Sequence, residues 1–356
     1  MNISVDFCGG NANILSIEEN RVRFAPDLRD TDGDWFYWAF KVTGAAGKTV
    51  EFDMSPKRYI GPFGAAVSHD LVDWSWSNTM TQSGSVFTYT FADDEDCVYF
   101  AHNMLYHPSR FHKFCELHKL PLRILTADNK GTPIPFVTLG NDGDKSVILT
   151  ARHHCCEATG NYIMEGILDE YLRCPTKGIK LIAVPFVDAD GVVAGDQGKN
   201  RHPHDHNRDY IDEPLYNGVR SVIELMRKEN PIAVFDLHSP WHTGGRNDKV
   251  FFVRGIPEMR DRMIELAGYF GQMITPEAMK YDIADDIDPG VEWNNIDKHI
   301  TCGSYASDVQ GNIFGFSLET TYFGEVGNVV SQAKLVETGR CFWRGFELYL
   351  NNNKLI

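Results

Sequence analysis

Two residues that could bind one metal ion, His154 and Glu157, follow an apolar run that ends at Ala151. Neutral imidazole and carboxylate both suit zinc, and a catalytic zinc site takes three protein ligands and keeps a position open for water. The pair falls where a strand would turn into the next helix, so both side chains could face the same ion. By itself this spacing is a weak signal and more often marks an ordinary polar strand end.

A third ligand should come from a second strand end, and His238 is the candidate. It follows the apolar run at 233–237 without a break. A lone histidine in such a position is more often structural. However, functional sites of open α/β sheets lie at the carboxyl ends of the strands, so two strand-end sites of this kind support each other.

A carboxylate at a further strand end, Glu319, completes the set of reactive side chains. It closes the apolar run at 313–318. Such a residue is either an exposed strand end or a general base in a partly desolvated cleft, where burial raises its pKa toward working pH. The residue types alone favour neither role.

A long polar loop at 188–210 carries three cations, Lys199, Arg201 and Arg208. In an acidic chain, a group of cations in one loop indicates a site for an anion such as a carboxylate, which the planar arginine fork binds well. A solvated loop with incidental charge is the alternative interpretation.

The elements that must position these residues fall into two regions. Up to about residue 102, short aromatic and β-branched runs are separated by turns, which predicts a small antiparallel β-sandwich without a long helix. These runs are 21–24, 35–42, 49–52, 86–91 and 98–101. A short helix or linker from His107 then leads to the second region, so we expect domains at 1–119 and 120–356.

In the second region, strands alternate with amphipathic helices, which predicts a mixed-sheet α/β domain. We expect strands near 146–151, 180–187, 232–237 and 313–318, and helices near 162–172, 213–229, 257–274 and 330–350. The candidate site residues would then meet at the carboxyl ends of the strands.

The composition excludes several classes of function. The chain has 356 residues, and 34 basic against 49 acidic side chains give a net charge of −15, so nucleic acid is an unfavourable partner. No run approaches the roughly 18 apolar residues of a membrane span. The N-terminal residues lack the pattern of a secretory signal, and the eight cysteines show no Cys-x-x-Cys spacing. We therefore expect a cytoplasmic protein with no membrane partner, and its oligomeric state stays open.

The order of these motifs resembles the zinc carboxypeptidase A-like family, and more narrowly its cytosolic branch, which includes tubulin-deglutamylating enzymes. The motifs are Ala-Arg-x-His-x-x-Glu at 151–157, Asp-Gly-Val at 190–192, Asp-x-Asn-Arg at 205–208, Asp-Leu-His at 236–238 and the strand that ends at Glu319. That branch carries an N-terminal β-sandwich, which the aromatic runs at 35–38 and 97–102 resemble. The resemblance covers nearly the whole chain.

The resemblance implies a role for each candidate residue. His154, Glu157 and His238 would hold one zinc ion, His154 being preferred to His153 because it gives the family's spacing to Glu157. Asp205 would orient a ligand histidine through its second ring nitrogen. The substrate's terminal carboxylate would be bound by the pair Asn207 and Arg208. Glu319 would be the general base that deprotonates water and later protonates the leaving amine.

The family also has an arginine upstream of Asp-x-Asn-Arg that stabilises the oxyanion. Arg201 is the choice here, and Lys199 competes with it because a gapless alignment falls on Gly198 beside the lysine. Two features depart from the family. Cys155-Cys156 replaces a common Pro-Gly, and Tyr305 lies too close to Glu319 to match the tyrosine that caps substrate in pancreatic members.

These observations predict a zinc-dependent carboxypeptidase that removes a C-terminal residue from a peptide or protein, through a peptide or isopeptide bond. The cytosolic branch implies a preference for acidic residues, with which Lys199 and Lys298 are compatible. A zinc amidase or deacylase acting on a cell-wall peptide or an N-acyl amino acid is the nearest alternative. A non-catalytic zinc-binding homologue is the other.

Overall fold

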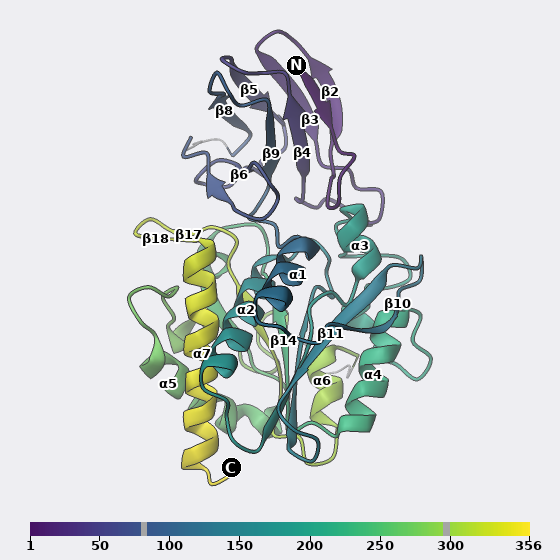
Figure 1. Ribbon diagram of the computed structural model, residues 1–356, viewed down its shortest axis with the longest axis vertical. Coiled ribbons are helices and arrows are strands. Elements are labelled where there is room, and N and C mark those ends of the chain that lie inside the picture. Colours follow the sequence, from purple (N-terminus) through teal and green to yellow (C-terminus); the bar gives the residue numbers. More distant parts are fainter. Residues whose placement is uncertain (80–83, 295–299) are drawn as a thin grey trace.

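The computed structural model describes residues 1–79, 84–294 and 300–356. The chain forms two parts, and the N-terminal one lies on top of the larger C-terminal one (Figure 1). Lys298, one of the two cations considered for substrate preference, lies outside the described residues.

The N-terminal part consists of two facing sheets. One has the strand order β1-β4-β9-β6-β7 and the other β2-β3-β5-β8. All described pairs are antiparallel except β3 with β5. The strands are β1 (Asn2–Ser4), β2 (Asn13–Ile17), β3 (Arg21–Ala25), β4 (Ala39–Thr43), β5 (Thr49–Asp53), β6 (Ala66–Ser68), β7 (Ser75–Trp76), β8 (Val86–Thr90) and β9 (Cys97–Ala101).

Alternation of buried and exposed residues explains how these strands pack. In β3, Val22 and Phe24 are buried while Arg21 and Arg23 are exposed. The inward side chains form an aromatic core between the sheets, in which the rings of Phe52 and Phe87 stack at 4.7 Å. The predicted β-sandwich is confirmed.

One predicted strand is shorter than expected, because β4 begins at Ala39 and the residues 35–38 before it are irregular. Their backbone has partners in the other part of the molecule. The Tyr37 N–H donates to Gln197 Oε1, 2.9 Å away, and the Tyr37 carbonyl accepts from Gln197 Nε2 at 2.8 Å. Aromatic composition predicted a strand here, but a contact about 160 residues away along the chain determines the conformation.

The helix after the sandwich packs on the C-terminal part. Helix α1 (Pro108–Leu117) carries Arg110, whose guanidinium donates two hydrogen bonds to Glu165, and Tyr106 just before the helix donates a third. Glu165 belongs to α2 (Thr159–Arg173). The described strands of the sandwich end at Ala101. The segment after them is anchored to the second part by the bonds of Tyr106 and Arg110 to Glu165.

The C-terminal part is built on a seven-stranded mixed sheet, in the order β10-β11-β13-β12-β14-β16-β15. Its four central strands run parallel and are almost entirely buried, whereas the remaining strands pair antiparallel. The strands are β10 (Arg123–Ala127), β11 (Pro133–Leu139), β12 (Lys145–Ala151), β13 (Ile179–Val184), β14 (Ala233–His238), β15 (Val250–Val253) and β16 (Phe314–Thr320). A separate hairpin is formed by β17 (Gly324–Glu325) and β18 (Asn328–Val329). The predicted mixed α/β sheet is confirmed.

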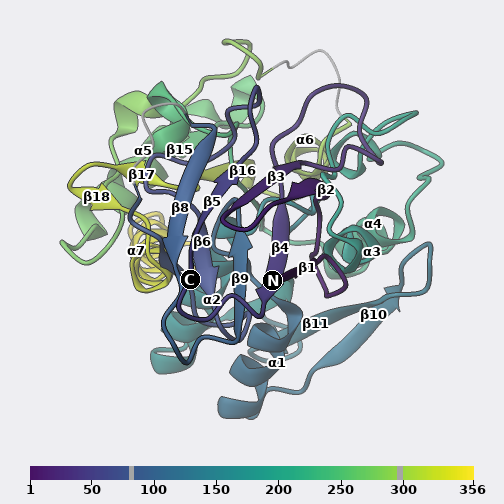
Figure 2. The same ribbon diagram turned by 90° about the horizontal axis from the view of Figure 1, so that it is seen from above.

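Helices cover both faces of this sheet, with α2, α5 and α7 on one side and α4 and α6 on the other (Figures 1 and 2). The longer ones not yet given are α4 (Asn217–Glu229), α5 (Arg260–Met273) and α7 (Gln332–Asn352), and the short ones are α3 (Ala189–Ala194), α6 (Cys302–Ser307) and four 3₁₀ turns (His206–Arg208, Gly245–Asp248, Pro257–Met259 and Ile283–Asp285). None of the helices within the described ranges is long and apolar enough to cross a membrane.

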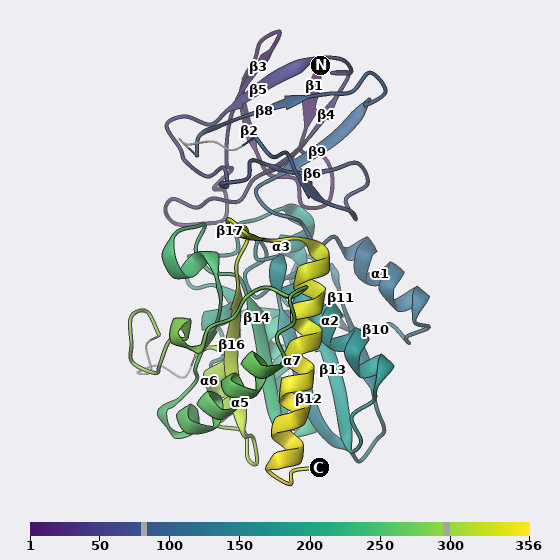
Figure 3. The same ribbon diagram turned by 90° about the vertical axis from the view of Figure 1, so that its left-hand side faces the viewer.

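Helix α7 extends from the junction of the two parts to the far end of the molecule (Figure 3). It crosses α2 at two glycines, with almost no space between the backbones. A Cβ atom on Gly166 would lie 1.9 Å from the Val336 carbonyl oxygen, and one on Gly339 would lie 2.1 Å from that of Ile163. The two helices therefore pack backbone to backbone here.

Candidate active site

Three side chains that could hold a metal meet at the carboxyl ends of neighbouring parallel strands. His154 and Glu157 lie in the turn between β12 and α2, and His238 is the last residue of β14. Glu157 Oε1 lies 2.9 Å from His154 Nδ1, and Glu157 Oε2 lies 2.7 Å from His238 Nδ1. The structure thus brings together the three residues that the sequence selected, all of them buried.

The second ring nitrogen of each histidine faces another carboxylate. His154 Nε2 lies 3.3 Å from Asp205 Oδ1, and His238 Nε2 lies 2.6 Å from Asp236 Oδ2. Burial opposes ionisation of both acids, but the neighbouring histidines hold the pKa of Asp205 and of Asp236 well below the usual range. Such partners orient metal-binding imidazoles and increase their basicity.

Asp236 was not selected from the sequence, although its position carried a signal. It lies two residues before His238 on β14, so both side chains point to the same face of the strand. Asp236 Oδ1 also accepts hydrogen bonds from His153 Nδ1 and from Thr150 Oγ1, each at 2.8 Å. His153 therefore supports Asp236, and these two residues with His238 form another buried group at metal-ligand distances, which shares His238 with the Glu157 cluster.

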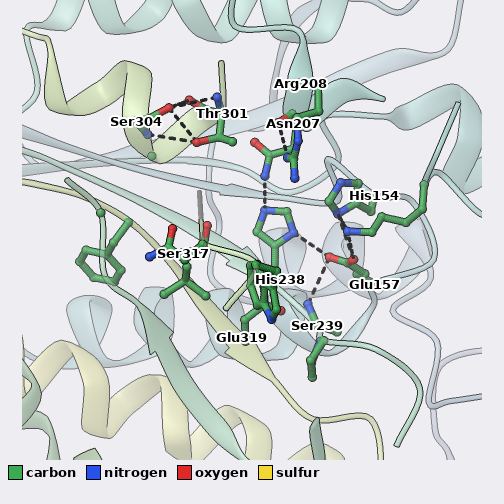
Figure 4. Close-up of a pocket in the computed structure, with 18 of the residues that line it drawn as sticks. His154, Glu157, Asn207, Arg208, His238, Ser239, Thr301, Ser304, Ser317 and Glu319 are labelled. Atoms are coloured by element: carbon green, nitrogen blue, oxygen red, sulfur yellow. Dashed lines mark hydrogen bonds and ion pairs between the residues drawn. The ribbon is translucent and has the colours of Figure 1, made fainter. Parts of the chain in front are cut away.

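Glu319 lies beside His238, since the two residues are partners in the register of β14 and β16. Figure 4 shows its side chain near that of His238. The Glu319 carboxyl is buried, and its Oε2 atom has no hydrogen-bond partner among the residues that the structure describes. Burial raises the pKa of Glu319 to about 7, although His238 lowers it. A carboxyl group with this pKa can take up and release a proton near neutral pH.

A cavity of about 410 Å³ opens over these residues and is lined by His154, Glu157, His238 and Glu319. Arg208 also lines it, and the exposed guanidinium is held by one bond from Nη1 to the Asn207 carbonyl at 2.7 Å. Asn207 Nδ2 lies 3.1 Å from His238 Nε2, and its Oδ1 accepts from the Cys302 N–H at 2.9 Å. These contacts place an amide and a guanidinium on one wall.

Small side chains form another wall of the cavity. The main-chain and side-chain atoms of Gly303, Ser304, Gly315 and Ser317 line it. Figure 4 shows Ser304 and Ser317 on the side of the cavity away from His154. None of these four residues extends a large side chain into the cavity.

Lys199 and Arg201, the two cations that competed for one role, occupy different environments. Lys199 lines the cavity, and its Nζ lies 3.3 Å from His154 Nδ1 and 3.7 Å from Glu157 Oε1.

Arg201, which the sequence favoured for stabilising the oxyanion, does not line the cavity. Its guanidinium is bound by Asp30 at 3.0 Å, Asp188 at 2.7 Å and Asp196 at 3.2 Å. Because three carboxylates bind this guanidinium outside the cavity, its position does not match the role that the sequence suggested. Tyr305 is also absent from the lining, and its hydroxyl accepts from Arg227 Nε at 3.1 Å.

A group of buried side chains away from the cavity, Asp128, Asp188 and His206, also lies within metal-ligand distances. Arg201 Nη1, however, contacts Asp188 Oδ2 and lies 3.2 Å from His206 Nδ1. Because the guanidinium cannot accept a proton, this contact places the proton of a neutral His206 on Nε2, which lies 3.7 Å from Asp188 Oδ1 and has no hydrogen-bond partner among the described residues. We therefore interpret the group as a structural network.

Tryptophan side chains line the mouth of the cavity and come from distant segments. Trp35 belongs to the N-terminal part, and Trp241 follows β14. Trp293 lies one residue before the end of the described range 84–294. The rings of Trp35 and Trp241 meet edge to face with centroids 4.7 Å apart. The contribution of the sandwich to the cavity was not predictable from the sequence, because a local pattern carries no information about contacts between domains.

Comparison with known proteins identifies the relatives of this chain. Residues 3–102 match the family model of the cytosolic carboxypeptidase N-terminal domain. Mouse cytosolic carboxypeptidase 3 is 28% identical over 198 residues, which are 46% of this chain and 19% of that protein. In sequence, this chain resembles the cytosolic carboxypeptidases. The alignment spans only about a fifth of the mouse protein.

Structural similarity extends over the whole chain. A metallo-carboxypeptidase from Burkholderia cenocepacia superposes with a TM-score of 0.81 over 99% of both chains, at 16% identity. An uncharacterised protein of Zymomonas mobilis is 26% identical over 259 residues, 67% of each chain. The chain therefore has the fold of the metallo-carboxypeptidases, and its N-terminal part matches the model of the cytosolic carboxypeptidase N-terminal domain.

Proposed function

We propose that this protein is a zinc-dependent carboxypeptidase that hydrolyses the C-terminal peptide or isopeptide bond of a peptide or protein. One observation carries the proposal: the His154, Glu157 and His238 cluster, the buried Glu319 and the exposed Arg208 guanidinium line the same cavity. A metal, a base and a carboxylate-binding group are the parts that this reaction requires. The resemblance to the cytosolic branch supports a cytoplasmic substrate.

The residues of the cluster fit zinc. Two imidazole Nδ1 atoms and one carboxylate converge, and the other nitrogen of each imidazole faces an acid that fixes its orientation. When bound, zinc would lower the pKa of water and polarise the substrate carbonyl. With three protein ligands, a bound zinc would keep one position for water, as catalytic zinc sites require.

Glu319 is the proposed base. Its unpartnered Oε2 and its raised pKa of about 7 support proton uptake from the attacking water, followed by transfer of that proton to the leaving amine. The water oxygen forms the new bond to the carbonyl carbon while the bond from that carbon to nitrogen breaks. Glu319 then returns to its ionised form.

Arg208 and Asn207 are proposed to bind the free carboxylate of the substrate. A guanidinium forms two parallel hydrogen bonds with a carboxylate, and within the described ranges this one makes a single bond, to the Asn207 carbonyl. Binding there would place the terminal side chain against the small-residue wall and the preceding peptide bond beside Glu319. This arrangement restricts cleavage to the last residue.

Lys199 is proposed to stabilise the charge that develops on the carbonyl oxygen, in place of Arg201. Its ammonium lies at the edge of the metal-binding cluster, whereas the Arg201 guanidinium is bound by three carboxylates. Removing one donor of this kind typically costs about 10²–10³-fold in kcat.

The first experiment is mass spectrometry of a mixed peptide library incubated with the zinc-loaded protein, with and without a chelator. We expect loss of single C-terminal residues that the chelator prevents. Amidated copies of the same peptides serve as a matched control, because they lack the charge that Arg208 would bind. An unchanged library would refute the carboxypeptidase and favour an amidase of another substrate class or a non-catalytic zinc protein.

A further inference from the structure

The loop that carries Lys199 is held by the N-terminal part of the molecule along most of its length. Four N-terminal residues donate hydrogen bonds to main-chain carbonyls of this loop and of the end of α3 before it. These bonds run from Gly9 N–H to Val193 O at 3.1 Å, from Asn11 Nδ2 to Gly195 O at 2.7 Å, from Arg29 Nη2 to Ala194 O at 2.5 Å, and from Asp32 N–H to Asn200 O at 2.9 Å.

Asp30 makes the most concentrated contact with this loop. Its Oδ1 accepts from the Gln197 N–H at 2.8 Å, and its Oδ2 accepts from the Gly198 N–H at 2.9 Å and from Arg201 Nε at 3.0 Å. One carboxylate thus binds residues on both sides of Lys199. Three donors on a largely buried carboxylate form a strong attachment, because bonds to an ionised group are about twice as strong as neutral ones.

Gln197, a residue of the loop, attaches it to the N-terminal part through its own side chain. Its buried carboxamide bonds to the N–H and the carbonyl of Tyr37, and it donates to the Asp27 carbonyl at 3.1 Å. A side chain with all its bonds satisfied inside the partner domain has little freedom to move. The backbone immediately before Lys199 is therefore fixed.

The opposite side of the loop rests against the metal-binding turn. Gly198 has φ +76°, and a Cβ atom there would lie 2.4 Å from the Cys155 backbone nitrogen, next to His154. The loop is thus confined between Asp30 on one side and the metal-binding turn on the other. Trp35 adds a contact to the lysine itself, since Lys199 Nζ lies 5.7 Å from the centroid of its ring.

We propose that the N-terminal part completes the catalytic centre, with Asp30 as a positioning residue that acts through Lys199. This inference rests on the proposed function, in which Lys199 stabilises the charged carbonyl oxygen. Stabilisation of this kind operates in the transition state, so displacement of the ammonium lowers kcat more than it changes KM. A displacement of about 1 Å can cost up to roughly 10²-fold in rate.

The test is a double-mutant cycle in the zinc-loaded, full-length protein with a peptide that the library identifies as a substrate. Asp30→Asn keeps the shape of the side chain but removes its charge and one acceptor. We expect kcat to fall about 10- to 100-fold with little change in KM and with one zinc still bound. In a Lys199→Ala background, the same change should alter kcat by less than about twofold, because the group it positions is absent.

A matched control is Gln332→Ala at a different contact between the two parts. Gln332 accepts from the Trp74 N–H at 3.0 Å and donates to the Val72 carbonyl at 2.8 Å. This variant weakens the domain contact without touching the Lys199 loop, so its kcat should equal that of the wild type. A fall similar to that of Asp30→Asn would overturn the inference, because it would show a general effect of the interface.

Other outcomes distinguish a failure of the positioning role of Asp30 from a failure of the proposed function. If Lys199→Ala lowers kcat and Asp30→Asn has the same effect in both backgrounds, or loses zinc, the positioning role is wrong while the carboxypeptidase stands. If Lys199→Ala leaves kcat unchanged, the proposed role of the lysine fails first. An unchanged kcat in Asp30→Asn alone also overturns the inference.

Discussion

Asp236 offers a decisive test of how the chain prepares its metal site. The carboxylate is completely buried and links His238 at 2.6 Å to His153 and Thr150, each at 2.8 Å. Asp236→Asn retains nearly the same shape but removes the negative charge and replaces one acceptor by a donor. We expect the variant to fold and to bind zinc more weakly.

The expected size of the loss follows from the geometry. Removing a partner that orients a ligand histidine typically weakens metal binding 10- to 100-fold, which corresponds to about 1.4–2.7 kcal/mol. The short bond and full burial of Asp236 place it near the upper end of that range. Asp205 is the matched comparison, because it partners His154 at 3.3 Å and is 10% exposed, so Asp205→Asn should lie near the lower end.

The assay is competition for zinc against a chelator of known affinity, using wild type, Asp236→Asn and Asp205→Asn at one pH. Thermal unfolding of the metal-free proteins shows whether each variant is folded. Equal zinc affinity in wild type and Asp236→Asn would refute the argument, and so would a larger loss in Asp205→Asn than in Asp236→Asn.

Three further predictions concern the reaction and its pH dependence. Glu319→Gln should keep zinc but lower kcat by about 10²–10⁴-fold, measured by peptide mass spectrometry, and an active variant would exclude the proposed base. Wild type should prefer a free C-terminus to an amidated one, and Arg208→Ala should lose most of that preference, whereas an unchanged ratio would contradict carboxylate binding there. Burial disfavours a charged His238, but Asp236 and Glu157 raise its pKa well above the ordinary value, so the metal-free imidazole carries a proton that zinc must displace. Zinc affinity should therefore fall as pH falls, and calorimetry in buffers of different protonation enthalpy should show about one proton released; no dependence on the buffer would contradict this.

Local patterns were sufficient to find the residues at strand ends. His238 and Glu319 each close an apolar run, and parallel strands place such residues side by side, as the β14–β16 register does. The same rule could have found Asp236, which shares a face with His238. The principal strands and helices were predictable for the same reason, because their periodicity is set by residues close together in the chain.

Loop conformation was not predictable in this way. Lys199 lines the cavity and Arg201 does not, and the loop that carries both is bound by Asp30, which is about 170 residues away in sequence. Residues 35–38 are irregular for a similar reason, since Gln197 takes the bonds that a strand partner would have made. Contacts between domains leave no periodic signal in either segment.

The crossing of α2 and α7 carries a consequence for how this chain tolerates substitution. Helix α2 begins two residues after Glu157, so its position fixes the turn that holds two of the three candidate ligands. At Gly166 and Gly339 the addition of a single methyl group would force the helices apart. Alanine at either glycine should therefore weaken metal binding from a distance. Gly166 and Gly339 carry no reactive group, yet they should be among the least replaceable residues of the protein.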